Sequence, residues 1–241
     1  MTSQLRRDIR RLKIWSVGST CLLVLGAVTV FTQGQAGGTR FQEISVERIN
    51  IIEQDGRVKL VLANGARQAD AVIDGRVIVP GRTRPAGLMF FNDEGDEVGG
   101  LIFSGRTQDG QPRATGSLTF DQWKQDQTVA LQYVDQNGQR RAGLSVIDRP
   151  NTSLAVFAGM AEKRLALSTD AERAVFDREV AALRAQNAPR LFAGKDTGGN
   201  ATVVLSDPQG RQRLVMTVDP AGRPSIRFLD ESGRTVREIV P

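Results

Sequence analysis

An uncharged apolar run near the N-terminus constrains this chain more than any other feature. Residues 14–31 read IWSVGSTCLLVLGAVTVF, and five cations precede them, namely Arg6, Arg7, Arg10, Arg11 and Lys13. A run of about 18 uncharged residues can cross the hydrocarbon core of a bilayer as one helix, and basic residues beside one end stay in the cytoplasm. We therefore expect a cytoplasmic basic tail over residues 1–13, a transmembrane helix over 14–32 and a periplasmic remainder. This topology makes the protein a single-pass protein of the inner (cytoplasmic) membrane.

Three export signals are alternatives to a permanent anchor. A cleaved signal peptide has an apolar core of about 7–15 residues and a small-x-small cleavage site, whereas this core is longer and Gly34-Gln35-Ala36 is a weak match. A lipoprotein cysteine would follow the apolar core, but Cys21 lies inside it. Arg10-Arg11 is followed by residues that match a twin-arginine signal poorly. The sequence favours a retained helix and leaves cleavage as the alternative.

The basic charge of the chain is concentrated in its first residues. The formal net charge is +5, and residues 1–13 contribute +4 of it. The rest of the chain is therefore nearly neutral, which disfavours a surface that tracks nucleic-acid phosphates. We expect the partners to be the lipid bilayer and other integral membrane proteins, with no nucleic acid.

The residue types exclude most catalytic chemistry. The chain contains no histidine, and its one cysteine is Cys21. Histidine is the commonest general base and transition-metal ligand, and zinc or iron–sulfur sites need histidine or cysteine. A Ser–Lys dyad, a carboxylate pair and a calcium site remain open by residue type, but no spacing singles one out. We expect no enzymatic activity, no catalytic residue, no cofactor and no metal, with an unrecognised hydrolase as a minor alternative.

A recurring turn pattern divides most of the chain into short strands. Seven turns have a polar or acidic first residue and a glycine fourth, and they begin at Glu53, Asn92, Thr107, Asp135, Asp207, Asp219 and Asp230. An Asp or Asn in first place can accept a backbone N–H two residues on, and glycine in fourth place can take the left-handed conformation that closes a type I turn with a bulge. Between the turns, apolar and polar residues alternate with period two, so one face should pack and the other meet water. This pattern predicts a mainly β fold with an up-and-down antiparallel meander.

The chain divides into further segments after the span. Residues 33–40 form a Gly-rich linker, 41–150 a front β block, 151–188 a helical insert and 189–241 a C-terminal β-meander. In the insert, Ser168-Thr169-Asp170 can cap a helix that extends to about Gln186. The expected strands lie near residues 42–53, 57–63, 71–79, 86–92, 99–105, 114–120, 128–134, 141–147, 201–205, 213–218, 225–229 and 235–240. The pattern leaves open whether the two β blocks form one sheet or two.

A few residues are candidates for protein contacts. Gly18 and Gly26 would let another helix approach the membrane span closely. Arg82 and Arg84 lie in a longer excursion, residues 68–85, which a rigid sheet can present to a partner. Trp123 stands in a polar segment, where it can anchor a protein or stack on a sugar, or fold over the sheet edge.

The densest acidic cluster is a second feature with two interpretations. Residues 92–97 read NDEGDE, and their carboxylates could hold calcium, which prefers oxygen ligands. The cluster lacks the alternation and the terminal glutamate of an EF-hand loop. The favoured interpretation is a hairpin tip, and calcium binding stays open.

The chain resembles uncharacterised bacterial proteins that are membrane-anchored or secreted. Their signature GLxFxNDEGxExGGLxF is similar to residues 87–103, and their second motif, DQxxQDQxVALQYxDxNGxRRAGLxV, is similar to residues 121–146. This resemblance implies no activity and no site residue. In topology and size the chain is also similar to the extra extracytoplasmic subunit of Gemmatimonas-type reaction-centre–light-harvesting complexes. That resemblance implies a structural role beside a photosynthetic membrane complex.

These observations favour a non-enzymatic, membrane-anchored extracytoplasmic accessory subunit that scaffolds or stabilises a larger membrane protein complex. The alternative is an envelope binding module for a small ligand or a glycan, which would use a sheet face or Trp123.

Overall fold

The computed structural model describes residues 9–10, 12–20 and 40–241. Contacts divide the chain into two compact units, Met1–Ser45 and Val46–Pro241. In the first unit, residues 12–20 are helical, and they include the start of the predicted span. Most of that span, together with Gly26 and residues 33–39 of the predicted linker, lies outside the described residues. Among the described residues, no helix is both long enough and apolar enough to cross a membrane.

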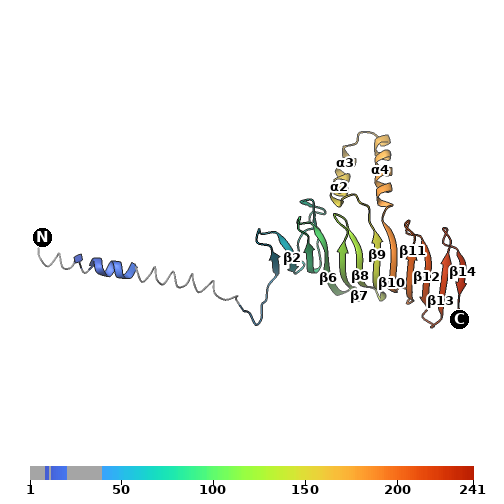
Figure 1. The fold of residues 1–241 in the computed structure, drawn as a ribbon, viewed down its shortest axis with the longest axis horizontal. Coiled ribbons are helices and arrows are strands. Elements are labelled where there is room, and N and C mark those ends of the chain that lie inside the picture. The colour runs from blue at the N-terminus through green and yellow to red at the C-terminus, as the bar shows by residue number, and fades with distance from the viewer. Residues whose placement is uncertain (1–8, 11, 21–39) are drawn as a thin grey trace. The chain divides into compact units, whose positions relative to one another are not determined.

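The second unit is built on one antiparallel sheet of twelve strands (Figure 1). All twelve lie side by side in chain order, and the small hairpin of β3 (Val72–Ile73) and β4 (Arg76–Val77), which comes between β2 and β5 in the sequence, forms a separate two-stranded sheet. This meander confirms the mainly β fold class that the sequence predicts. The sheet consists of β1 (Arg48–Ile52), β2 (Val58–Ala63), β5 (Ala86–Phe91), β6 (Glu97–Gln108), β7 (Gln111–Asp121), β8 (Gln127–Gln136), β9 (Gln139–Asp148), β10 (Ala188–Lys195), β11 (Ala201–Ser206), β12 (Gln212–Val218), β13 (Pro224–Leu229) and β14 (Thr235–Ile239).

The turn glycines are in the left-handed conformation that the sequence pattern predicts. The φ angle of each of the seven is positive, from 74° at Gly110 to 88° at Gly56. In the three C-terminal turns, the first-place aspartate accepts the backbone N–H two residues on and also pairs with an arginine four residues on, as in Asp207–Arg211 at 2.7 Å. The turns that begin at Thr107 and Asp135 differ from the expected type I turn with a bulge. In these two turns the third residue, Asp109 or Asn137, has a positive φ as well as the glycine. These two are two-residue type I′ hairpins, whose twist matches that of the flanking strands.

The helical insert connects two neighbouring strands of the same sheet. It contains α2 (Leu154–Ala158), α3 (Met160–Ala166) and α4 (Asp170–Arg184), and α4 has the predicted start, with Thr169 and Glu172 in a reciprocal capping box. Arg164 of α3 binds Asp177 of α4 at 2.7 Å, and the two helices extend past the strand ends (Figure 1). Because β9 and β10 pair directly across this insert, the front and C-terminal blocks form one sheet.

The buried core lies on one face of the sheet, near β2 and β5. Val61, Ala63, Met89 and Phe91 form it, and the excursion between β2 and β5 folds over them. Ile73 of that excursion is buried, and the Gln68 amide donates to the backbone oxygens of Pro85 and Gly87 at 3.3 and 3.2 Å. The residues 64–85 thus cover part of this face.

Candidate functional site

One face of the sheet carries an unbroken line of aliphatic side chains from the first strand to the last. Residues opposite each other in neighbouring antiparallel strands project on the same side, and the strand register connects one such residue from every strand. We call this line the central row. It consists of Ile49, Leu62, Leu88, Leu101, Leu118, Leu131, Leu144, Ala193, Val203, Met216, Ile226 and Ile239.

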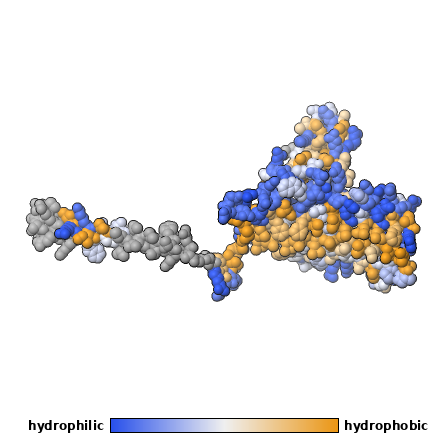
Figure 2. Space-filling model, in the orientation of Figure 1, coloured by the Kyte–Doolittle hydropathy of each residue, from blue (hydrophilic) through white to orange (hydrophobic). Residues whose placement is uncertain are grey.

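Two further rows flank the central row on the same face. The first contains Ile51, Leu60, Phe90, Gly99, Phe120, Val129, Val146, Leu191, Leu205, Leu214, Phe228 and Arg237. The second contains Ala86, Phe103, Gly116, Tyr133, Ala142, Lys195, Ala201, Val218 and Pro224. We call the three rows together the apolar face. It appears as the hydrophobic band across the sheet in Figure 2.

The apolar face is the more exposed side of the sheet. Leu131 is 56 % exposed, Phe103 59 % and Phe120 52 %, whereas Ala130 and Thr119, which point to the other side, are buried. The period-two pattern therefore located the apolar side chains, but the expectation that this face packs is wrong within the unit Val46–Pro241. The excursion covers the opposite face instead, because Val61, Met89 and Phe91 make that face apolar at β2 and β5.

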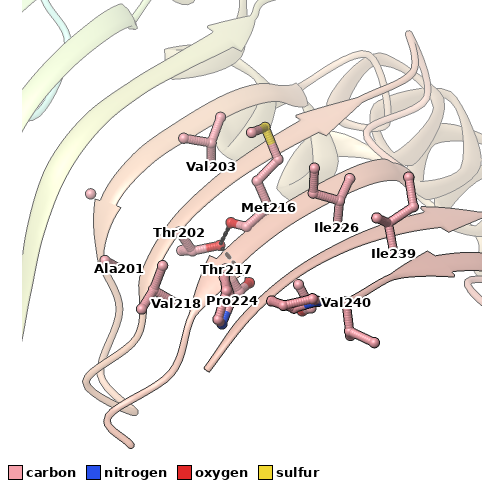
Figure 3. Close-up of a pocket in the computed structure, with 13 residues that line it drawn as sticks. Ala201, Thr202, Val203, Met216, Thr217, Val218, Pro224, Ile226, Ile239 and Val240 are labelled. Carbon is pink, nitrogen blue, oxygen red and sulfur yellow. Dashed lines mark hydrogen bonds between the residues drawn. The ribbon is translucent and has the colours of Figure 1, made fainter. Parts of the chain in front are cut away.

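The C-terminal end of the apolar face is hollowed. Val203, Met216, Ile226 and Ile239 stand on the same side of neighbouring strands (Figure 3) and line a cavity of about 760 Å³. The hydroxyl of Thr202, which precedes Val203 on β11, donates to the Met216 carbonyl oxygen at 3.0 Å. This arrangement exposes apolar side chains with few polar groups among them, which suits an apolar contact better than a polar ligand.

Of the predicted contact residues, Arg82, Arg84 and Trp123 belong to the unit Val46–Pro241, and none of the three is part of the apolar face. Arg84 is largely buried, and its guanidinium binds Glu97 at 2.7 Å, so it links the excursion to β6. Arg82 is exposed in the same excursion. Trp123 is 58 % exposed at the β7–β8 turn, and the Lys124 ammonium lies 5.5 Å from its ring centroid. An added Cβ at Gly18 would meet nothing within 4 Å.

The acidic hairpin tip, residues 92–97, contacts strand β2, the β3–β4 turn and the β7–β8 turn. Asp96 is 1 % exposed and accepts the backbone N–H of Asp74 at 2.7 Å. Lys59 binds Asp93 at 2.5 Å, and Lys124 binds Glu94 at 3.3 Å as well as Asp74. Asp93, Glu94 and one oxygen of Asp96 thus have partners within the protein, whereas the other Asp96 carboxyl oxygen is buried without a hydrogen-bond partner. In the described part of the chain no three Cys, Asp or Glu side chains come together as a metal site.

The face opposite the apolar face, which we call the mixed face, contains a polar hollow of about 420 Å³. Its lining includes hydroxyl, amide and carboxyl groups from Ser117, Thr119, Asp121, Gln125 and Gln132. Burial raises the pKa of Asp121 to about 7, and the negative charges of Glu97 and Asp126 add to the shift. One Asp121 carboxyl oxygen is buried and has no hydrogen-bond partner.

We expect Asp121 to make stability depend on pH near neutrality. The folded group keeps its proton up to about pH 7, and the unfolded group loses it near pH 3.8, so the free energy of unfolding should fall as pH rises between these values. Asp121→Asn should remove this fall and stabilise the protein at pH 8 by about 2 kcal/mol, which is below the full value of such a shift because the side chain is partly exposed. Urea unfolding of both proteins at pH 5 and pH 8 checks this. An equal dependence on pH in the two proteins would refute it.

Comparison of the chain with models of known protein families, with curated proteins and with solved structures gives no match. The fold itself therefore defines the class, a mainly antiparallel β protein with a large meander sheet. The apolar face is its most distinctive surface, and the candidate residues chosen from the sequence do not include it.

Proposed function

We propose that the protein is a non-enzymatic, membrane-anchored extracytoplasmic accessory subunit that scaffolds or stabilises a larger membrane protein complex. The observation that carries the proposal is the apolar face, which crosses all twelve strands and is exposed in the unit that contains it. A soluble protein rarely leaves so large an apolar patch in water, and such patches mark protein or membrane contacts. The uncharged run over residues 14–31 places this surface beside a membrane in our proposal.

Two features support a structural role over a catalytic one. The chain lacks histidine, and the carboxylates of the acidic tip bind groups of strand β2 and of two neighbouring turns. The similarity to the extracytoplasmic subunit of Gemmatimonas-type complexes makes a photosynthetic reaction-centre–light-harvesting complex a candidate host. The anchor belongs to the proposal as well, and a mature N-terminus near Gly37 would argue against it.

Purification from native membranes tests this function. The protein, extracted in a mild detergent, should elute as part of a larger assembly, and mass spectrometry should identify integral membrane proteins that co-elute with it in constant ratio. Because the contacts are apolar, the assembly should survive a rise in salt that screens charge contacts. Recovery of the protein as a lone monomer under these conditions would contradict the proposal.

A second candidate function rests on the polar hollow of the mixed face. Hydroxyl and amide groups such as those of Ser117, Thr119 and Gln132 can form hydrogen bonds with a small polar ligand or a glycan. Thermal unfolding of the full chain in the presence of a glycan panel tests this function. A rise in the midpoint with one glycan and no change for the Gln132→Ala variant would favour a binding module over a scaffold.

A further inference from the structure

We propose that the apolar face of one chain packs against the apolar face of a second copy, giving a β-sandwich dimer of two twelve-stranded sheets. This inference rests on the proposed function in one respect, namely that the apolar face is a contact surface. It goes further because it names the occupant. The mixed face, the helical insert and the sheet edges then remain available to other subunits.

The size of the face fits a stable dimer. Twelve strands about 4.8 Å apart make a sheet about 50 Å wide, and three rows along the strands occupy about 20 Å. Each copy can therefore bury about 1,000 Å², so that the pair buries about 2,000 Å², which lies where standard interfaces pass into obligate homodimer interfaces. Two copies also have the same strand twist, and sheets of equal twist stack in aligned sandwiches about 10 Å apart.

The face carries both protrusions and gaps. In one flanking row, Phe103 and Tyr133 stand on either side of Gly116, and Ala142 follows Tyr133. A Cβ added at Gly116 would meet nothing within 4 Å, so the space above it is open. A twofold interface brings the same patch together from both copies. The aromatic rings of one copy can then enter the gaps on the other copy, which gives the close packing of a protein interior.

The charge distribution points to an uncharged partner. Among the residues of the three rows, the charged ones are Lys195 and Arg237, which belong to the flanking rows, and the central row contains none. The interiors of homodimer interfaces are similarly depleted of charge. Association of two such faces therefore brings few like charges together. A partner that binds through ion pairs would find few charged side chains on this face.

Cross-linking in native membranes tests the dimer. Cys21 is replaced by serine, and single cysteines are introduced by Leu118→Cys, Leu131→Cys and Leu144→Cys in the middle of the central row, where residues near a twofold axis meet their own copies. The full-length variants are treated with a short bismaleimide. We expect at least one central-row variant to give a cross-linked species of twice the chain mass that contains this protein alone. Gln132→Cys and Ser145→Cys, on the same sheet but on the mixed face, serve as controls and should not give it.

The other outcomes overturn the dimer and separate it from the proposed function. A product that joins the central-row cysteine to a different protein refutes the second copy but retains the accessory-subunit role. If none of the three cysteines cross-links, although each becomes reactive with a monofunctional maleimide once the membrane is dissolved, something other than a second copy covers the face, which refutes the dimer and retains the contact surface. A central-row cysteine that reacts freely in the membrane indicates an uncovered face, and then both proposals fail.

Discussion

The double variant Leu131→Glu/Leu144→Glu is expected to leave its native assembly and elute as a single chain. Both side chains belong to the central row and are exposed in the isolated unit, by 56 % and 38 %. In an assembled complex each glutamate would replace a buried apolar contact with a carboxylate that has no partner. Loss of the two contacts and the cost of burying the charges should weaken association by about 4 kcal/mol, or about 1,000-fold.

A matched charge change on the same strands serves as the control. Gln136 and Gln139 are exposed at the β8–β9 turn, so Gln136→Glu/Gln139→Glu adds the same charge away from the apolar face. Size-exclusion chromatography with light scattering compares the two variants with the parent in one detergent. The thermal midpoint of the single chain should be nearly the same for all three, because none of these substitutions touches the buried core. An assembly that withstands the central-row variant as well as the control would show that the apolar face is not its contact surface.

Gly194→Ala is expected to destabilise the sheet by about 3 kcal/mol, since a methyl group has no space there. A Cβ at this position would lie 2.1 Å from the Ala142 carbonyl oxygen and 2.5 Å from the Gly143 Cα atom. Both are backbone atoms of β9, so β9 and β10 would have to separate. This strand pair joins the front block to the C-terminal block across the helical insert.

Gly116→Ala is the control for this effect. An added Cβ there meets nothing within 4 Å, so the free energy of unfolding should change by less than about 1 kcal/mol. Urea unfolding, followed by circular dichroism, measures both variants. Equal stability of the two variants would show that the backbones of β9 and β10 do not approach each other as closely as the register indicates.

Local signals in the sequence predicted much of the fold. The turns formed where glycine occupies the fourth place, and α4 begins at Asp170 behind its cap Thr169, because these structures depend on residues within four positions of each other. Type I′ hairpins at Asp109-Gly110 and Asn137-Gly138 were missed, although each has the two-residue sequence that favours this turn. The strands β6 to β9 are longer than expected, because polar residues near the turns continue the ladder.

The candidate site could not be predicted from the same signals. Period-two alternation places Leu131 and Tyr133 on one face of β8, but it does not say what covers that face. The answer depends on where the excursion of residues 64–85 folds, and on pairing between residues far apart in the sequence, such as Leu144 with Ala193. Arg84 likewise has no partner nearby in the sequence, whereas Glu97, which its guanidinium binds, belongs to β6.

The accessibility of Leu131→Cys in spheroplasts tests the central claim most directly. The variant is made with Cys21→Ser, and a membrane-impermeant maleimide is added before and after the membrane is dissolved in SDS. If the apolar face is a contact surface, the cysteine reacts much more slowly than a Gln136→Cys control before dissolution and equally fast afterwards. Equal rates for the two cysteines in intact spheroplasts would contradict the claim.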